Sequence, residues 1–157
     1  MKTFSRLILA LFTLLVITIS NNSRADDLLK IADVEAATGL KGLKLVPKDP
    51  MKGAGGTLNF ADADGKLVLL VMIEPMSTLR TWKQRYANCE ATASLGSDGC
   101  VANVDKTFGF MMGFAYFSKN NKAIWLQQMG NKAGDVKKPN IDKATITKLA
   151  QLAYDRS

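Results

Sequence analysis

The chain has 157 residues, a formal net charge of +7 and no histidine. Histidine is the side chain that most often serves as a general base and as a metal ligand. Its absence excludes a Ser-His-Asp or Cys-His hydrolase and a histidine-ligated zinc or copper centre.

The N-terminal residues have the composition of an export signal. A basic start is followed by a largely apolar stretch from Leu7 to Ile19, and Ser23-Arg24-Ala25 places small residues at the two positions that a signal peptidase reads. We therefore predict a bacterial signal peptide over residues 1–25, with cleavage after Ala25. The remaining residues, 26–157, are expected to form one domain of a periplasmic or secreted protein.

Cleavage would also lower the charge of the protein. Loss of Lys2, Arg6 and Arg24 reduces the 21 basic residues to 18, against 14 acidic residues, which leaves a net charge of +4. A surplus this small, spread along the chain, argues against nucleic acid as a partner. No second long apolar segment follows, so we expect no stable membrane span after cleavage.

The first half of the mature chain predicts one helix and three strands. Residues 28–39 favour a helix with Asp33 as its N-cap, and residues 40–46 favour a strand. Two more strands, 57–62 and 66–74, flank an Asp-Gly turn. The continuous apolar run from 67 to 73 predicts a central strand that is covered on both faces.

Residues 77–95 switch to helical periodicity, with Ser77 as a possible N-cap. One apolar stripe contains Leu79, Trp82, Tyr86, Cys89 and Ala93. In an oxidising compartment we expect Cys89 and Cys100 to form a disulfide that ties the end of this helix to the next segment. Their spacing differs from the C-x-x-C of redox-active pairs, which favours a structural role.

The last part of the chain predicts two or three strands and a helix. The strands are expected at 101–107, 108–118 and 122–129, with a turn at Asn120-Asn121, and the helix at 141–155. Four residues are expected to face inward from this helix: Ile146, Leu149, Ala150 and Ala153. The order predicts an α+β domain with an antiparallel sheet of five to six strands and three helices.

This order of elements, with the segment ADVEAATGL opening the domain, resembles that of small exported α/β sandwich domains. These are the PsbP-like group and related bacterial secreted proteins of unknown role. The resemblance implies an antiparallel sheet with helices packed on it. It also implies a binding or accessory role in place of catalysis.

The segment TFGFMMGFAYF, residues 107–117, alternates large and small side chains as a strand with two different faces would. The small face would allow a helix to pack closely. The large face carries Phe108, Phe110, Met112, Phe114 and Tyr116. It is either core or, together with Trp82 and Trp125, a surface for an apolar ligand or a periplasmic protein partner. We take this set as the candidate site.

Two loops resemble ion-binding motifs. DADGK, residues 62–66, begins like a calcium loop but lacks the third aspartate and the glutamate, so a hairpin turn is expected. The segment 48–57 combines lysines and glycines without P-loop spacing, and we expect a connecting loop. With Lys41 and Lys44 it leaves open a modest basic patch for an acidic partner or anionic lipid headgroups.

Two other functions remain as alternatives. A carboxylate-dependent enzyme would need Glu74 or Glu90 in a cleft beside a second acid. A Cu(I) carrier would need three converging thioethers, with Pro75 bending the chain between Met72 and Met76. We expect the methionines to fill the core and assign no catalytic residue, metal or cofactor. The leading hypothesis is a non-catalytic binding or accessory protein.

Overall fold

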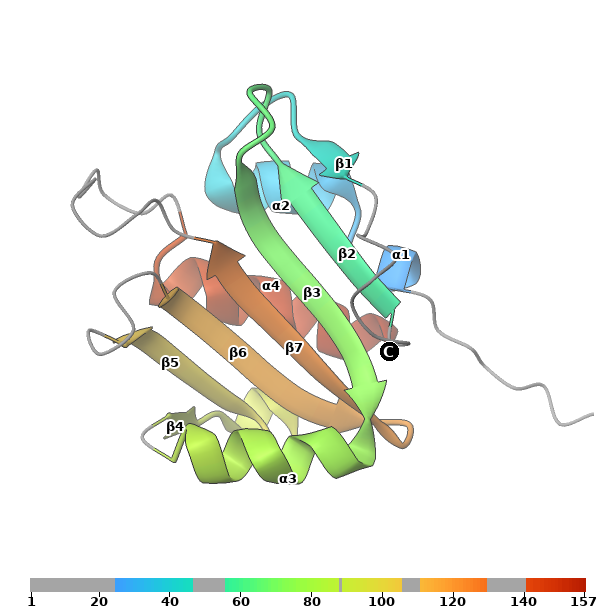
Figure 1. Cartoon of the computed structure of the whole chain (residues 1–157), viewed down its shortest axis with the longest axis vertical. Helices are drawn as coiled ribbons and strands as arrows, with labels where there is room; N and C mark the ends of the chain where they lie inside the picture. Colours follow the sequence, from blue (N-terminus) through green and yellow to red (C-terminus); the bar gives the residue numbers. More distant parts are fainter. Residues whose placement is uncertain (1–24, 47–55, 88, 106–110, 130–140) are drawn as a thin grey trace, which may run out of the picture.

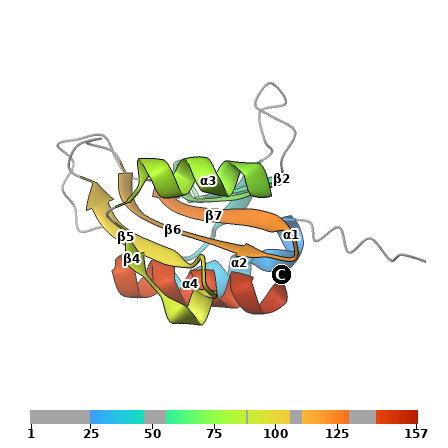
Figure 2. The same ribbon diagram turned by 90° about the horizontal axis from the view of Figure 1, so that it is seen from below.

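The computed structural model describes residues 25–46, 56–87, 89–105, 111–129 and 141–157. They form one seven-stranded antiparallel sheet with helices on both faces (Figures 1 and 2). In chain order the elements are α1 (Ala25–Leu28), α2 (Ile31–Thr38), β1 (Lys44–Val46), β2 (Gly56–Ala61), β3 (Leu67–Pro75), α3 (Met76–Arg85), β4 (Glu90–Ala91), the 3-10 helix η1 (Ala93–Leu95), β5 (Cys100–Asp105), β6 (Met111–Lys119), β7 (Lys122–Met129) and α4 (Lys143–Arg156). The predicted α+β class is confirmed, with seven strands in place of five to six.

The strands lie in the order β1-β2-β3-β7-β6-β5-β4. The central pair is β3 with β7, where Leu69–Pro75 runs against Lys122–Gln128. The first three strands therefore meet the last strand of the chain in the middle of the sheet. Helix α3 then carries the chain from the end of β3 to β4 at the opposite edge (Figure 1).

Both predicted hairpin turns are confirmed. Gly65 has a φ of 81°, and the Asp62 carboxylate accepts hydrogen bonds from the backbone N–H groups of Asp64 at 3.0 Å and Lys66 at 2.8 Å. The calcium-like DADGK segment is thus the turn between β2 and β3. Asn120 and Asn121 both have positive φ, 48° and 59°, as a two-residue hairpin between twisted strands requires.

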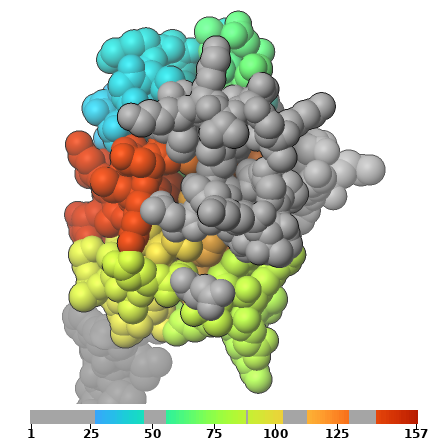
Figure 3. All heavy atoms as spheres, turned by 90° about the vertical axis from the view of Figure 1, so that its left-hand side faces the viewer, coloured from blue at the N-terminus to red at the C-terminus, as the bar shows by residue number. Residues whose placement is uncertain are grey.

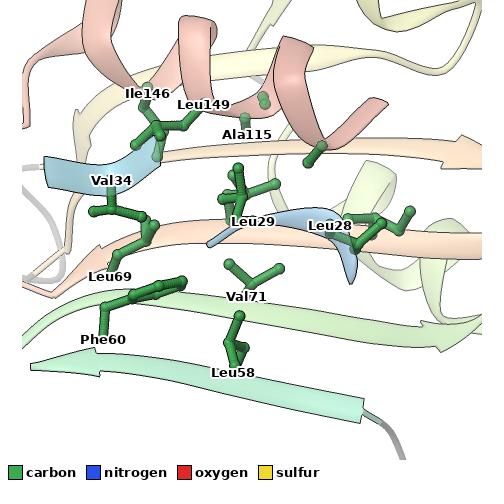
Figure 4. Close-up of a cluster of buried hydrophobic side chains, with 14 of the residues drawn as sticks. Leu28, Leu29, Val34, Leu58, Phe60, Leu69, Val71, Ala115, Ile146 and Leu149 are labelled. Carbon is green, nitrogen blue, oxygen red and sulfur yellow. The ribbon is translucent and has the colours of Figure 1, made fainter. Parts of the chain in front are cut away.

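The larger core lies between the sheet and the helices α1, α2 and α4 (Figure 4). All four residues of α4 predicted to face inward are fully buried. They pack on the small face of β6, where Ala115 is also fully buried, so the prediction of a helix on that face is confirmed. Phe117, on the same face, meets the ring of Tyr154 edge-on at 5.3 Å.

Glycine and capping geometry correct two predicted boundaries near the N-terminus. The strand predicted at 40–46 begins only at Lys44, because Gly39 and Gly42 adopt the left-handed φ values of 75° and 70°. Asp33 is not the N-cap of α2. It lies in the first turn and its carboxylate accepts a hydrogen bond from the backbone N–H of Lys30, the true N-cap, at 2.7 Å.

The helix predicted at 77–95 is wrong in its second half. Helix α3 begins after Pro75 and ends at Arg85. Residues 90–91 instead pair with Val101 and Cys100 as the short hairpin β4–β5, with η1 and the positive φ of Gly96 inside it. The backbone N–H and C=O groups of residues 90–91 are thus hydrogen-bonded to β5. In a longer helix they would have been hydrogen-bonded within the helix.

The apolar run 67–73, predicted to be covered on both faces of the sheet, lies in β3 and is buried on one face only. Leu69, Val71 and Ile73 are buried toward α4, whereas Leu70 and Met72 on the other face are half-buried. The reason is that α3 crosses only one end of that second face (Figure 1).

Candidate functional site

A second hydrophobic cluster lies beneath α3, on the other side of the sheet from the larger core. Its five rings, which we call the aromatic cluster, are Trp82, Tyr86, Phe114, Tyr116 and Trp125. Phe114 and Trp125 stack at a centroid distance of 4.6 Å with only 11° between their planes. Trp82 reaches Trp125 from α3 at 5.1 Å, and Tyr86 contacts it at 5.0 Å. The cluster thus joins α3 to β6 and β7 through ring contacts.

The structure places the predicted ligand surface mostly in this core. Phe114, Tyr116, Trp125 and Trp82 are exposed by only 3%, 3%, 2% and 8%. Phe114, Tyr116 and Trp125 lie under α3, and Trp82 packs against them from that helix. Phe108, Phe110 and the side chain of Met112 lie outside the described residues.

The predicted disulfide between Cys89 and Cys100 is confirmed, with a Cα–Cα distance of 5.7 Å. It joins the segment after α3 to the first residue of β5 and borders the aromatic cluster. The Tyr116 hydroxyl lies 3.1 Å from Cys89 Sγ, to which it can donate a weak hydrogen bond. Burial, aided by the negative charge of Asp98, raises the pKa of Tyr116, so this hydroxyl keeps its proton.

A polar link outside the aromatic cluster also holds α3. The Asp98 carboxylate forms an ion pair with Lys83 of α3 and accepts a hydrogen bond from the Ser118 hydroxyl of β6 at 2.5 Å. These two hydrogen bonds, with Lys83 as the larger contribution, lower the pKa of Asp98. Helix α3 is therefore fixed by β3 at its start, by the disulfide after its end and by Asp98 in between.

Beyond α3, the same face of the sheet carries a strip that no described helix covers (Figure 1). We call it the open strip. Its five half-buried residues are Thr57, Asn59, Leu70, Met72 and Gln127. Strand register places them side by side, because Thr57 lies opposite Met72 and Asn59 opposite Leu70, which in turn lies opposite Gln127. The strip combines two apolar side chains with two amides and one hydroxyl.

A hydrogen bond connects the open strip to the aromatic cluster. The indole N–H of buried Trp125 donates to Gln127 Oε1 at 3.2 Å. Any ligand that displaces the Gln127 amide would therefore change the environment of Trp125. The open strip was missed in the sequence, although the alternation of polar Thr57 and Asn59 with apolar Leu58 and Phe60 indicates a second, less buried face of β2.

The three glutamates are not arranged as a catalytic pair. Glu74 is the second-last residue of β3, just before α3, and Glu90 begins β4, after α3, which spans about 15 Å at 1.5 Å per residue. Paired catalytic carboxylates in glycosidases lie roughly 5–10 Å apart. Glu90 is 70% exposed and forms an ion pair with Lys143, while Glu35 accepts a hydrogen bond from the Leu43 N–H at 3.0 Å. Within the described ranges no three acidic or cysteine side chains come together as metal ligands.

The copper hypothesis required a bend of the chain between Met72 and Met76, and the structure has one. The chain bends at Pro75, where β3 passes into α3, and both Met72 and Met76 pack against the aromatic cluster. Met129 lies on the same face of β7 but four residues beyond Trp125, roughly 13 Å along the strand. Met51 and the side chains of 111 and 112 are outside the description. Met72 and Met76 therefore fill space beside the aromatic rings, as methionines commonly do in a core.

Comparison of the chain with protein-family models, with curated proteins and with solved structures found no match. In the part of the chain that the structure describes, no helix has the length and apolarity needed to cross a membrane.

Proposed function

We propose that this chain is an exported, non-catalytic binding or accessory protein whose ligand or protein partner contacts the open strip. The observation that carries the proposal is the unequal covering of the sheet. One face is closed by α1, α2 and α4, whereas α3 covers only one end of the other face (Figures 1 and 2).

The disulfide and the N-terminal sequence support export. A disulfide that borders a core is expected in an oxidising compartment such as the bacterial periplasm. Residues 1–25 have the basic start, apolar stretch and small residues of a signal peptide.

The chemistry of the open strip supports binding of a largely apolar group. Leu70 and Met72 offer apolar contact area, and the Asn59 and Gln127 amides can orient a few polar atoms of a ligand. The aromatic cluster next to the strip is fixed by ring contacts, the disulfide and the Asp98 link. A rigid base of this kind reduces the entropy lost on binding.

Introduction of a charge into the open strip tests the proposal. Leu70→Arg places a guanidinium in the middle of the strip, while Leu67→Arg makes the same change in the same strand at a residue that is already 39% exposed. Each protein is purified from the periplasm and analysed by native mass spectrometry for bound species. Tryptophan fluorescence is then followed during titration with periplasmic extract fractions.

We expect wild type and Leu67→Arg to carry the same bound species or to show the same fluorescence change, and Leu70→Arg to lose it. Thermal unfolding of each variant establishes that the folded protein is being compared. Equal binding by Leu70→Arg would contradict the proposed site. A wild-type protein with neither a bound species nor a fluorescence response would contradict the proposed function.

A further inference from the structure

A hollow of about 740 Å³ lies on the other side of the molecule, along the outer face of α4. Ser94 of η1 forms one wall, and η1 lies on the same side of the sheet as α4 (Figure 2). Figure 3 faces the side where the red start of α4 approaches the yellow segment from β4 to β5. The other lining residues come from α4: Lys143, Ala144, Thr147, Lys148, Gln151 and Leu152. This volume is within the range of small-molecule sites.

The hollow uses a face of α4 that is distinct from its core face. The lining residues of α4 form two adjacent rows at intervals of four residues, 143, 147 and 151 beside 144, 148 and 152, which together make one stripe along the helix. The core face carries Ile146, Leu149, Ala150 and Ala153, all fully buried. Helix α4 thus has one apolar face packed on the sheet and a second, partly apolar face that lines the hollow.

Most of the hollow surface is hydrocarbon. Ala144 and Leu152 are apolar, Thr147 contributes a methyl group, and its hydroxyl donates to the Lys143 carbonyl at 2.7 Å. The lysine side chains add their methylene stems, while Lys148 is exposed to water and the charged end of Lys143 pairs with Glu90. Such a surface suits a flexible alkyl chain.

The charges of the hollow are positive. Lys143 and Lys148 line it, and none of its described lining residues is acidic. Lys143 also pairs with Glu90, whose side chain is largely exposed, whereas exposed Lys148 has no ion-pair partner in the described part of the chain. Asp155 lies one turn beyond Gln151 and accepts a hydrogen bond from the Gln151 amide at 2.8 Å. A ligand with one anionic group near Lys148 would therefore be electrostatically favoured.

We propose that this hollow binds a free amphiphile with one carboxylate and a long alkyl chain, that is, a fatty acid. Its carboxylate lies beside Lys148 and Lys143, and its alkyl chain lies along Ala144, Thr147 and Leu152. The site is on the opposite side of the sheet from the open strip. Its test is therefore independent of the proposed function.

Ala144→Glu is the most informative variant. It places a carboxylate inside the hollow, next to the expected position of the ligand carboxylate. Residue 144 is the second residue of α4, and an acidic side chain in a first helical turn interacts favourably with the helix dipole. Weaker binding by this variant would therefore come from repulsion of the ligand, with the fold retained.

The experiment uses dansyl-undecanoic acid as a fluorescent probe, with laurate as competitor, both below their micelle concentrations. We expect wild type to bind the probe and laurate to displace it. Ala144→Glu should weaken binding at least tenfold and Lys148→Gln several-fold. Lys66→Gln, which removes an exposed lysine in the β2–β3 turn, is the matched control and should bind as wild type does.

The absence of probe binding by wild type would overturn the proposal, as would equal affinity in Ala144→Glu. Equal displacement by dodecyltrimethylammonium would also overturn it, because a cationic amphiphile should be repelled by the lysines. Co-sedimentation with anionic vesicles, without binding of the monomeric probe, would indicate a membrane-contacting surface in place of a fatty-acid site. Leu70→Arg should leave probe binding unchanged.

Discussion

On the α4 side, the sheet is covered by a helix that buries four small or aliphatic residues, and α1 and α2 extend this core. On the α3 side, the covering helix is mostly polar and buries only Leu79 and Trp82. The α3 side is held by stacked rings, a disulfide and an ion pair, and it leaves the open strip uncovered by any described helix. The comparison shows that a helix with a wide apolar face can close a sheet mainly by packing, with the Asp33–Arg156 and Lys143–Glu90 ion pairs at its ends. A helix with a narrow apolar face requires additional links and covers less of the sheet.

The largest expected effect comes from the α4 side. Phe117→Ala removes a fully buried ring between the sheet and α4, and such changes cost about 3–5 kcal/mol of unfolding free energy. Guanidinium unfolding followed by far-UV circular dichroism measures the loss. Leu67→Ala, at an exposed position, is the control and should change stability by less than about 0.5 kcal/mol. A similar loss in both variants would remove the distinction between core and surface on this sheet.

A smaller and more local effect is expected from the disulfide on the α3 side. The double variant Cys89→Ala/Cys100→Ala should lose about 3 kcal/mol, since it releases a short loop in the unfolded chain. Because the bond also restrains the end of α3, tryptophan fluorescence should shift to longer wavelength at lower denaturant concentration than the far-UV signal changes. Coincident transitions by both probes would show that the α3 side unfolds only with the rest of the domain.

The smallest effect is expected from the ion pair on the α3 side. Asp98→Asn should cost about 1 kcal/mol or less at neutral pH, since the pair is near the surface and screened by water. The folded pKa of Asp98 is lowered, so its contribution is present above the unfolded carboxyl pKa of about 3.9 and is lost as the pH falls through the folded value. The variant should therefore lose less stability than wild type as the pH falls below about 4.

Urea unfolding at a series of pH values measures this difference. Asp33→Asn is the matched variant on the α4 side, since the pKa of Asp33 is lowered chiefly by Arg156. Both variants should reduce the acid sensitivity of the domain. An Asp98→Asn curve parallel to that of wild type at low pH would show that the Lys83–Asp98–Ser118 link does not contribute to holding α3.

Local signals in the sequence predicted much of the fold. Asp-Gly at residues 64–65 and Asn120-Asn121 specified both hairpin turns, because their backbone preferences do not depend on distant residues. The apolar stripe of α4 was also sufficient to place its four buried residues. The small residues in the segment 107–117 indicated a face of β6 on which a helix could pack closely, and α4 lies on that face.

The remaining features depend on contacts between distant residues. The apolar stripe through Tyr86 and Cys89 continues past Arg85, but the disulfide and the pairing of β4 with β5 turn the chain there. The aromatic residues of β6 were compatible with a core and, as the alternative, with a ligand surface. Their burial is decided by the path of α3 across the sheet, which no local pattern specifies. For the same reason the open strip and the α4 hollow were not found.

The position of β7 between β3 and β6 has a consequence for how quickly the chain can fold. Until Lys122–Met129 is present, the N-terminal strands and the β5–β6 pair have no common neighbour in the sheet. Contacts between residues so far apart in sequence are formed slowly, because the loop between them must first close. An exported chain with this strand order would stay incompletely folded during translocation and would complete its sheet only after its last strand has crossed.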